Sequence, residues 1–286
     1  MNKTIVITDL TKMQGDRVCI AGLDRDGKCI RPVLKRLGED ITRSHLYIGD
    51  KLVIRPRAKV RFDFYPVRTA PPHIEDLGFD PATIRHEGFC DDSEWESILR
   101  ASLSPSVADI YDGLLQKPHW VEPGARTRSL GTVTDVQVAG MFFEQRGGKR
   151  EYRVAFMDGT GCRYDRVVIN DLMFRAFADA TVNRLNSTVR AAREIENMMI
   201  GVEHLYLRLG LARPWLNANS GKKECWMQVT GIHTFPDYLG GESGGDFCIP
   251  TKSSLSSKFN EGLQQLMKSV SRLSGASRSF SRYLTE

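Results

Sequence analysis

The runs LGTVTDVQVAGMFF (130–143), YRVAFM (152–157) and CRYDRVVI (162–169) decide the fold of the second half of this chain. Each has the apolar, β-branched and aromatic composition of a strand, and glycine-containing turns separate them. Residues 170–199 then have helical spacing, and HLYLRL (204–209) and CWMQVTGIH (225–233) are again strand-like. The order β, β, β, α, β, β predicts a five-stranded barrel with its helix between the third and fourth strands.

Barrels of this kind are called OB folds, and many of them bind oligonucleotides or oligosaccharides. The first 70 residues predict a second barrel of the same class. Residues 4–10, 16–23 and 28–34 are apolar runs, and a tight polar turn ending in Gly27 joins the last two. Residues 50–64 alternate apolar and charged side chains, as a strand with one buried face does. For the fifth strand, residues 65–69 are the nearest candidate.

We therefore expect a mainly β chain with helices, of the α+β class, in four parts. These are a first OB-like barrel (1–70), an acidic helical connector (71–125), a second OB-like barrel with a long helix at 170–199 (126–250), and a basic amphipathic tail (251–286). Ser93 and Glu96 fit a capping box at the start of a helix in the connector.

Charge is unevenly distributed along the chain, although the net charge is only +5. Residues 31–68 hold ten Lys/Arg and four Asp/Glu, whereas residues 69–125 hold three Lys/Arg and eleven Asp/Glu. Such segregation can build a basic surface for a polyanion. The alternative is that the two blocks face each other in the fold.

Three patches are candidates for contact with nucleic acid. In the first barrel, alternation places basic side chains on one strand face, where they would neutralise phosphates: Arg55, Arg57, Lys59 and Arg61. Near the end of another strand, Arg31 would grip a phosphate, or would instead form a salt bridge with Asp9. In the second barrel, the last two strands and their loop offer cations and flat rings for base stacking: Arg208, Arg213, Trp215 and Trp226. The alternative for these aromatic rings is burial in the core.

The tail predicts an amphipathic helix whose apolar stripe is a candidate partner-binding face: Leu255, Phe259, Leu263, Leu266, Val270 and Leu273. The alternative is that this helix packs on its own protein.

Motifs of the common enzyme classes are missing from the sequence. It has no G-x-x-x-x-G-K-[ST] or H-E-x-x-H motif, and its histidines and cysteines show no zinc spacing. We therefore expect no catalytic residues, no metal and no cofactor. The longest apolar runs are far shorter than the roughly 20 residues that a membrane span needs. We therefore expect no membrane association. Six cysteines without a C-x-x-C pair favour a reducing cytoplasm.

Two groups of segments resemble the bacterial dual OB-containing family. The first group is ITDLT (7–11), RVCIAG (17–22) and CIRP (29–32); the second is LRLGLARP (207–214), WMQVTGI (226–232) and TFPDYL (234–239). This resemblance implies two OB-type barrels, nucleic-acid binding, and a place in anti-phage or mobile-element systems. It implies no catalytic residues.

The sequence thus predicts a non-catalytic accessory protein that binds single-stranded or irregular DNA or RNA. One alternative is an interaction subunit that docks a protein partner through residues 251–286. A second alternative is a cryptic nuclease or nucleic-acid-modifying enzyme whose site is assembled from scattered residues.

Overall fold

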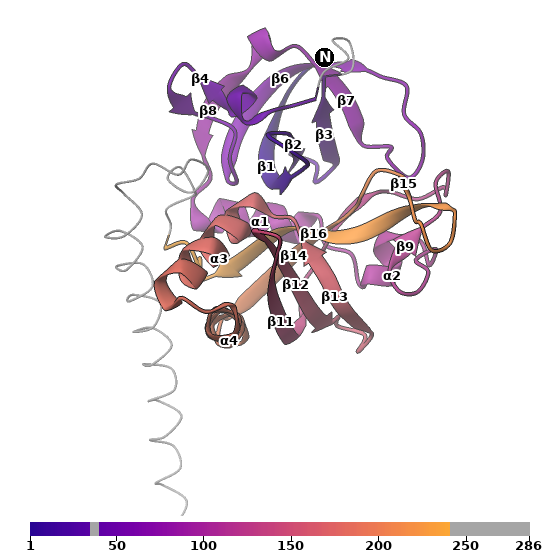
Figure 1. Ribbon diagram of the computed structural model, residues 1–286. Coiled ribbons are helices and arrows are strands. Elements are labelled where there is room, and N and C mark those ends of the chain that lie inside the picture. Colours follow the sequence, from indigo (N-terminus) through magenta and orange to yellow (C-terminus); the bar gives the residue numbers. More distant parts are fainter. Residues whose placement is uncertain (35–39, 241–286) are drawn as a thin grey trace, which may run out of the picture.

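The computed structural model describes residues 1–34 and 40–240, which form a closed barrel stacked on a second, larger sheet (Figure 1). This part of the chain is mainly β with few helices, as the sequence predicts. The predicted tail helix, with its six apolar candidates, lies outside the described residues, as do residues 241–250.

Five strands close the first barrel, in the order β1-β2-β3-β7-β6 with β6 pairing back to β1. The strands are β1 (Asn2–Lys12), β2 (Val18–Leu23), β3 (Cys29–Val33), β6 (Ala58–Pro66) and β7 (Asp76–Phe79). All neighbours are antiparallel except β3 and β7, which are parallel. Between β3 and β6 lie a short helix and a small ribbon: η1 (Arg43–Leu46), β4 (Tyr47–Ile48) and β5 (Lys51–Leu52).

The fifth strand of this barrel corrects our expectation. Residues 65–69 do not form it: β6 runs on through Pro66, and the closing strand β7 comes ten residues later, inside the stretch assigned to the connector. The alternation in β6 is confirmed, because Ala58, Val60, Phe62 and Phe64 are buried while Lys59 and Arg61 point outward.

Residues 71–125 hold further structure besides helices. After β7 come η2 (Pro81–Thr83) and β8 (Arg85–Phe89), which pairs with the outer edge of β6. The helix expected near Ser93 is present as α1 (Asp92–Ala101), and it is followed by α2 (Val107–Ile110) and β9 (Trp120–Val121). The cap of α1 is Asp91, whose side chain accepts a hydrogen bond from the Glu94 amide, and not the predicted Ser93.

The second sheet repeats the strand order of the first barrel. Its order is β10-β14-β16-β13-β12-β11, and β13 and β16 are parallel, as β3 and β7 are. The strands are β10 (Leu130–Val133), β11 (Gln137–Arg146), β12 (Lys149–Met157), β13 (Arg163–Ile169), β14 (His204–Leu211), β15 (Trp215–Leu216) and β16 (Lys223–Phe235). Residues 130–143, expected as one strand, are split between β10 and β11 at Asp135, whose φ of 55° interrupts extended backbone.

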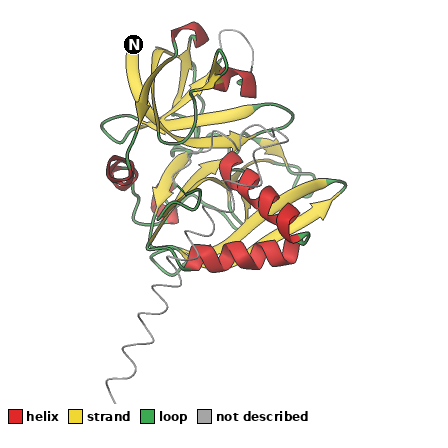
Figure 2. Ribbon diagram, turned by 90° about the vertical axis from the view of Figure 1, so that its left-hand side faces the viewer, coloured by secondary structure: helices red, strands yellow, loops and turns green. Residues whose placement is uncertain are grey.

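The helical insertion lies between β13 and β14, after the three strand runs from which the sequence predicts it. It is two helices, α3 (Leu172–Leu185) and α4 (Thr188–Ile200), rather than one helix over 170–199. Asn186 takes a left-handed conformation with φ 48°, and the Ser187 side chain then caps α4 by accepting from the Arg190 amide. Figure 2 shows both helices covering one side of the second sheet.

Polar and apolar contacts join the barrel to the second sheet. A cluster of Val6, Trp95 and Tyr206 brings β1, α1 and β14 together, and Leu172 at the start of α3 packs into the core of the first barrel. At the end of β1, the Lys12 amide donates to the carbonyl of Asn170 at 2.8 Å. Across the described ranges, no helix has the length and apolar character needed to cross a membrane.

Candidate nucleic-acid interface

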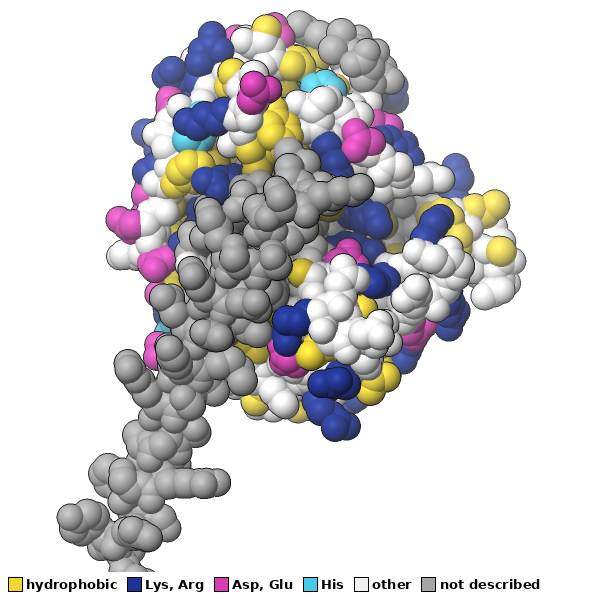
Figure 3. Space-filling view, turned by 60° about the vertical axis from the view of Figure 1, so that its left-hand side comes forward, with side chains coloured by type: hydrophobic (Ala, Val, Ile, Leu, Met, Phe, Trp, Pro, Cys, Tyr) yellow, Lys and Arg dark blue, Asp and Glu magenta, His cyan; other side chains and the backbone are white. Residues whose placement is uncertain are grey.

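A cleft of about 940 Å³ lies between the first barrel and the second sheet. The first barrel contributes β2, β3, the end of β1 and the loop 13–17; the second sheet contributes β12, β13, β16, the start of α3 and residues 210–215. In Figure 3, basic side chains gather in the hollow between the two bodies. Three acidic residues and eight basic ones line the cleft: Asp9, Asp40 and Glu151, with Lys12, Arg17, Arg31, Lys149, Arg150, Arg153, Arg175 and Arg213.

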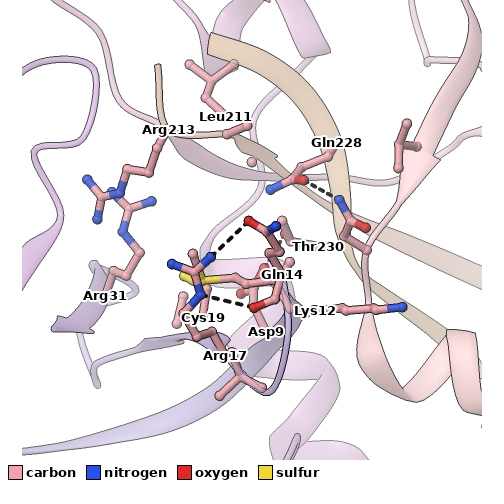
Figure 4. A pocket seen from close by; sticks show the side chains of 18 of the residues that line it. Asp9, Lys12, Gln14, Arg17, Cys19, Arg31, Leu211, Arg213, Gln228 and Thr230 are labelled. Carbon is pink, nitrogen blue, oxygen red and sulfur yellow. Dashed lines mark hydrogen bonds between the residues drawn. The ribbon is translucent and has the colours of Figure 1, made fainter. Parts of the chain in front are cut away.

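Two guanidinium groups share one buried carboxylate at one side of the cleft. Arg31, on β3, donates through Nε to Asp76 at 2.7 Å, and Arg213, beyond β14, donates to the same carboxylate at 2.9 Å. Burial opposes ionisation of Asp76, but the charges of Arg31 and Arg213 outweigh it and keep the pKa of Asp76 below its ordinary value. Arg31 is buried, whereas the Arg213 side chain is 44% exposed and is the one open to a ligand (Figure 4).

Another buried ion pair ties the barrel to the second sheet beside the cleft. Arg208, on β14, donates through Nε to Asp9 of β1 at 2.9 Å, and the hydroxyls of Thr8 and Thr230 also donate to that carboxylate. Burial opposes ionisation of Asp9, but the charge of Arg208 and these hydrogen bonds hold the pKa of Asp9 below its usual range. Arg208 is 1% exposed, so its role in this structure is to hold β14 against β1 rather than to meet a ligand. The predicted pairing of Arg31 with Asp9 is therefore not found.

The basic strand of the first barrel lies away from the cleft, and acidic side chains of residues 69–125 meet it. Lys59 pairs with Glu94 at 2.8 Å and Arg61 with Glu87 at 3.2 Å, while Arg57 pairs with Asp92. Arg55 lies over the Phe89 ring, 4.1 Å from its centroid. The charge segregation in the sequence thus reflects two blocks that face each other. None of these four cations lines the cleft.

The two tryptophans of the predicted stacking pair are in different environments. Trp215, on β15, is 60% exposed and lines the cleft, so its ring is available for stacking. Trp226 is half-buried, and its indole N–H donates to Glu224 at 2.8 Å. Of the predicted site residues, the structure brings Arg31, Arg213 and Trp215 together at the cleft.

Six cleft cations were absent from the sequence-based set: Lys12, Arg17, Lys149, Arg150, Arg153 and Arg175. They come from β1, the loop 13–17, β12 and α3, so no single local pattern joins them. Within residues 1–34 and 40–240, no group of three His, Cys, Asp or Glu side chains is arranged to hold a metal ion.

Residues 3–232 match the model of a protein family described as the dual OB-containing domain. The match covers both bodies of the fold and every residue that lines the cleft. A search of curated proteins finds no match to the chain.

Proposed function

The chain belongs to the dual OB-containing domain family, and from this membership and the cleft we propose that it binds single-stranded nucleic acid between its two bodies. OB folds take oligonucleotides on the face of their second and third strands and on the loops that join strands one to two and four to five. In the first barrel these elements are β2, β3 and the loop 13–17. In the second sheet they are β12, β13 and the loop 212–222, which contains β15.

The observation that carries the proposal is that one cleft is lined by both sets of elements. Residues of β2, β3 and the loop 13–17 face residues of β12, β13 and the loop 212–222 across it. The excess of cations suits a phosphate backbone. The exposed ring of Trp215 suits an unpaired base, because the faces of bases in a duplex are already stacked.

A binding measurement with a labelled oligonucleotide of about 30 nucleotides, as DNA and as RNA, tests this function. We expect affinity to fall with salt, by about 20-fold for a fourfold rise in concentration if three phosphates are neutralised on a single strand.

A matched pair of variants locates the binding site. Arg153 lines the cleft, whereas Arg193 is exposed on α4 and does not line it. Arg153→Glu should weaken binding about tenfold or more, through the loss of a cation and the added repulsion, and Arg193→Glu should leave it nearly unchanged. Absence of binding at low salt, or equal effects of the two variants, contradicts the proposal.

The prediction of a place in a bacterial anti-phage or mobile-element system rests on the family resemblance, and the prediction of a non-catalytic accessory role rests also on the missing enzyme motifs. Incubation of the bound oligonucleotide with Mg²⁺ or Mn²⁺ and inspection for cleavage or modification tests the non-catalytic part. The apolar stripe of residues 255–273 remains a prediction for a protein partner.

A further inference from the structure

The cations of the cleft fall into two groups. Five of them contact carboxylates: Arg17 with Asp40, Arg31 and Arg213 with Asp76, Arg150 with Asp179, and Arg153 with Glu151. Lys12, Lys149 and Arg175 form the second group. No carboxylate among the described residues lies within ion-pair distance of these three side chains.

Arg175 is the most constrained of the three. It is 8% exposed, and its guanidinium donates to two backbone carbonyls, of Ile169 at 3.0 Å and of Arg150 at 2.7 Å. One face of the group lies over the Tyr152 ring, 5.0 Å from the centroid. Burial lowers the pKa of Arg175. Tyr152, Asp179 and Glu151 act in the opposite direction. A buried charge without a hydrogen-bonded carboxylate is costly, and an anion beside it would offset that cost.

The first barrel contributes Lys12, at the end of β1, to the side of the cleft that Arg175 lines. Its backbone amide is bonded to the Asn170 carbonyl, two residues before α3. Partial burial lowers the pKa of the Lys12 ammonium, as do the charges of Arg175, Arg43 and Lys149, while Asp179 acts in the opposite direction. Figure 4 shows its side chain pointing away from Arg31 and Arg213, toward the other side of the cleft. Lys12 and Lys149 are both exposed, so each amine is free to move onto a ligand.

We propose that Lys12, Lys149 and Arg175 form a phosphate-binding subsite shared by the two bodies of the fold. The three side chains carry three positive charges and, among the described residues, no paired carboxylate. The two ammonium groups supply several hydrogen-bond donors that can turn toward a ligand. Lysine is an established point-charge partner of phosphate. This inference deepens the proposed function, because a strand in the cleft would supply the phosphate; a free nucleotide would offer the same chemistry.

The test uses the full-length chain and inorganic pyrophosphate, with binding measured by calorimetry. The test variant is Lys12→Gln/Lys149→Gln. The control is Lys28→Gln/Lys117→Gln, which removes two exposed lysines that do not line the cleft. We expect the test variant to weaken pyrophosphate binding at least tenfold and the control to match the wild type, with unchanged melting temperatures.

Two further readouts separate the subsite from the proposed function. Pyrophosphate should protect Lys12 from acylation, measured by mass spectrometry. With the oligonucleotide, the slope of log affinity against log salt should fall in the test variant by about 0.7 for each phosphate that the protein no longer neutralises. If the wild type binds the oligonucleotide but not pyrophosphate, or if the test variant behaves as the control, the subsite is wrong while the proposed function stands. If pyrophosphate binds through the two lysines and no oligonucleotide binds, the subsite stands and the proposed function fails.

Discussion

The carboxylate of Asp9 in the first barrel and the guanidinium of Arg208 in the second sheet form an ion pair, at 2.9 Å, that is almost fully shielded from water. The side chains are 2% and 1% exposed and come from positions 199 residues apart. Removal of one partner leaves the other as an uncompensated buried charge.

Asp9→Ala should therefore lower the free energy of unfolding by about 3–5 kcal/mol. Chemical denaturation measures this loss. The double variant Asp9→Ala/Arg208→Met should recover part of it, since no unpaired charge then remains. As a control, Asp26→Ala breaks an exposed pair with Arg25 and should cost less than about 1 kcal/mol. A similar small cost for Asp9→Ala would show that the buried pair does not hold the two bodies together.

Gly78 lets the closing strand of the first barrel pass beneath an aromatic ring. It is paired with Tyr65 across β6 and β7, and a Cβ at Gly78 would lie 2.1 Å from Cε2 of that ring. Gly78→Ala should destabilise the protein by roughly 1–3 kcal/mol through overpacking, and addition of Tyr65→Ala should relieve the clash. Gly159→Ala is the control, since its Cβ would meet only Asp135, at 3.8 Å. Thermal melts of the wild type and these three variants decide whether the ring is responsible.

His233 should make the protein acid-sensitive. Burial above all lowers the pKa of its imidazole from 6.5 to about 4, while Asp9 acts in the opposite direction and Arg208 and Arg57 in the same one. Between these two values the unfolded chain binds a proton that the folded chain does not, so stability falls as pH drops from 6.5 toward 4.

Denaturation at several pH values with His233→Gln checks this. The glutamine can still donate to the Thr8 carbonyl, which lies 3.0 Å from Nε2 of His233. The variant should lose less stability than the wild type on acidification, although His73, whose pKa burial lowers to about 3, keeps part of the dependence. His204→Gln alters an imidazole that is 46% exposed and should follow the wild-type curve. Parallel curves for wild type and His233→Gln would contradict the assignment.

Trp215 should contribute to the binding of single strands through its exposed ring. Trp215→Ala is expected to weaken oligonucleotide binding by about 1–3 kcal/mol, the usual contribution of one stacked base. Leu216→Ala is a matched control, because Leu216 is 58% exposed and adjacent side chains of a strand point to opposite faces. Fluorescence anisotropy measures both. Equal losses would instead indicate that the hairpin is a general contact surface.

The sequence predicts most of the strands, but it does not predict where one strand or helix ends and the next begins. Apolar runs mark most strands of both bodies because each buries a face. The strand β7 was missed because it has four residues and derives its place from pairing with β3, more than 40 residues earlier. The break between α3 and α4 had a local signal, since Asn186 followed by Ser187 is a common way to end one helix and cap the next.

The candidate site was only partly predictable, since charge alone does not show which cations are already paired. The dense run of Arg55, Arg57, Lys59 and Arg61 was the strongest basic pattern in the sequence, yet its neighbours in space are acidic side chains and an aromatic ring. Lys12, Lys149 and Arg175 are far apart in the sequence and line one cleft only after the barrel packs on the second sheet.

The contacts of β1 with β14 and with the residue segment before α3 also affect how a ligand enters the cleft. The walls of the cleft are joined beside it by Asp9 and Arg208 and at the end of β1 by Lys12 and Asn170. Because these contacts join the two bodies on both sides of β1, we expect the cleft to keep its width when a ligand enters. Association should then show a single kinetic phase, with a rate that rises linearly with ligand concentration and depends on electrostatic steering.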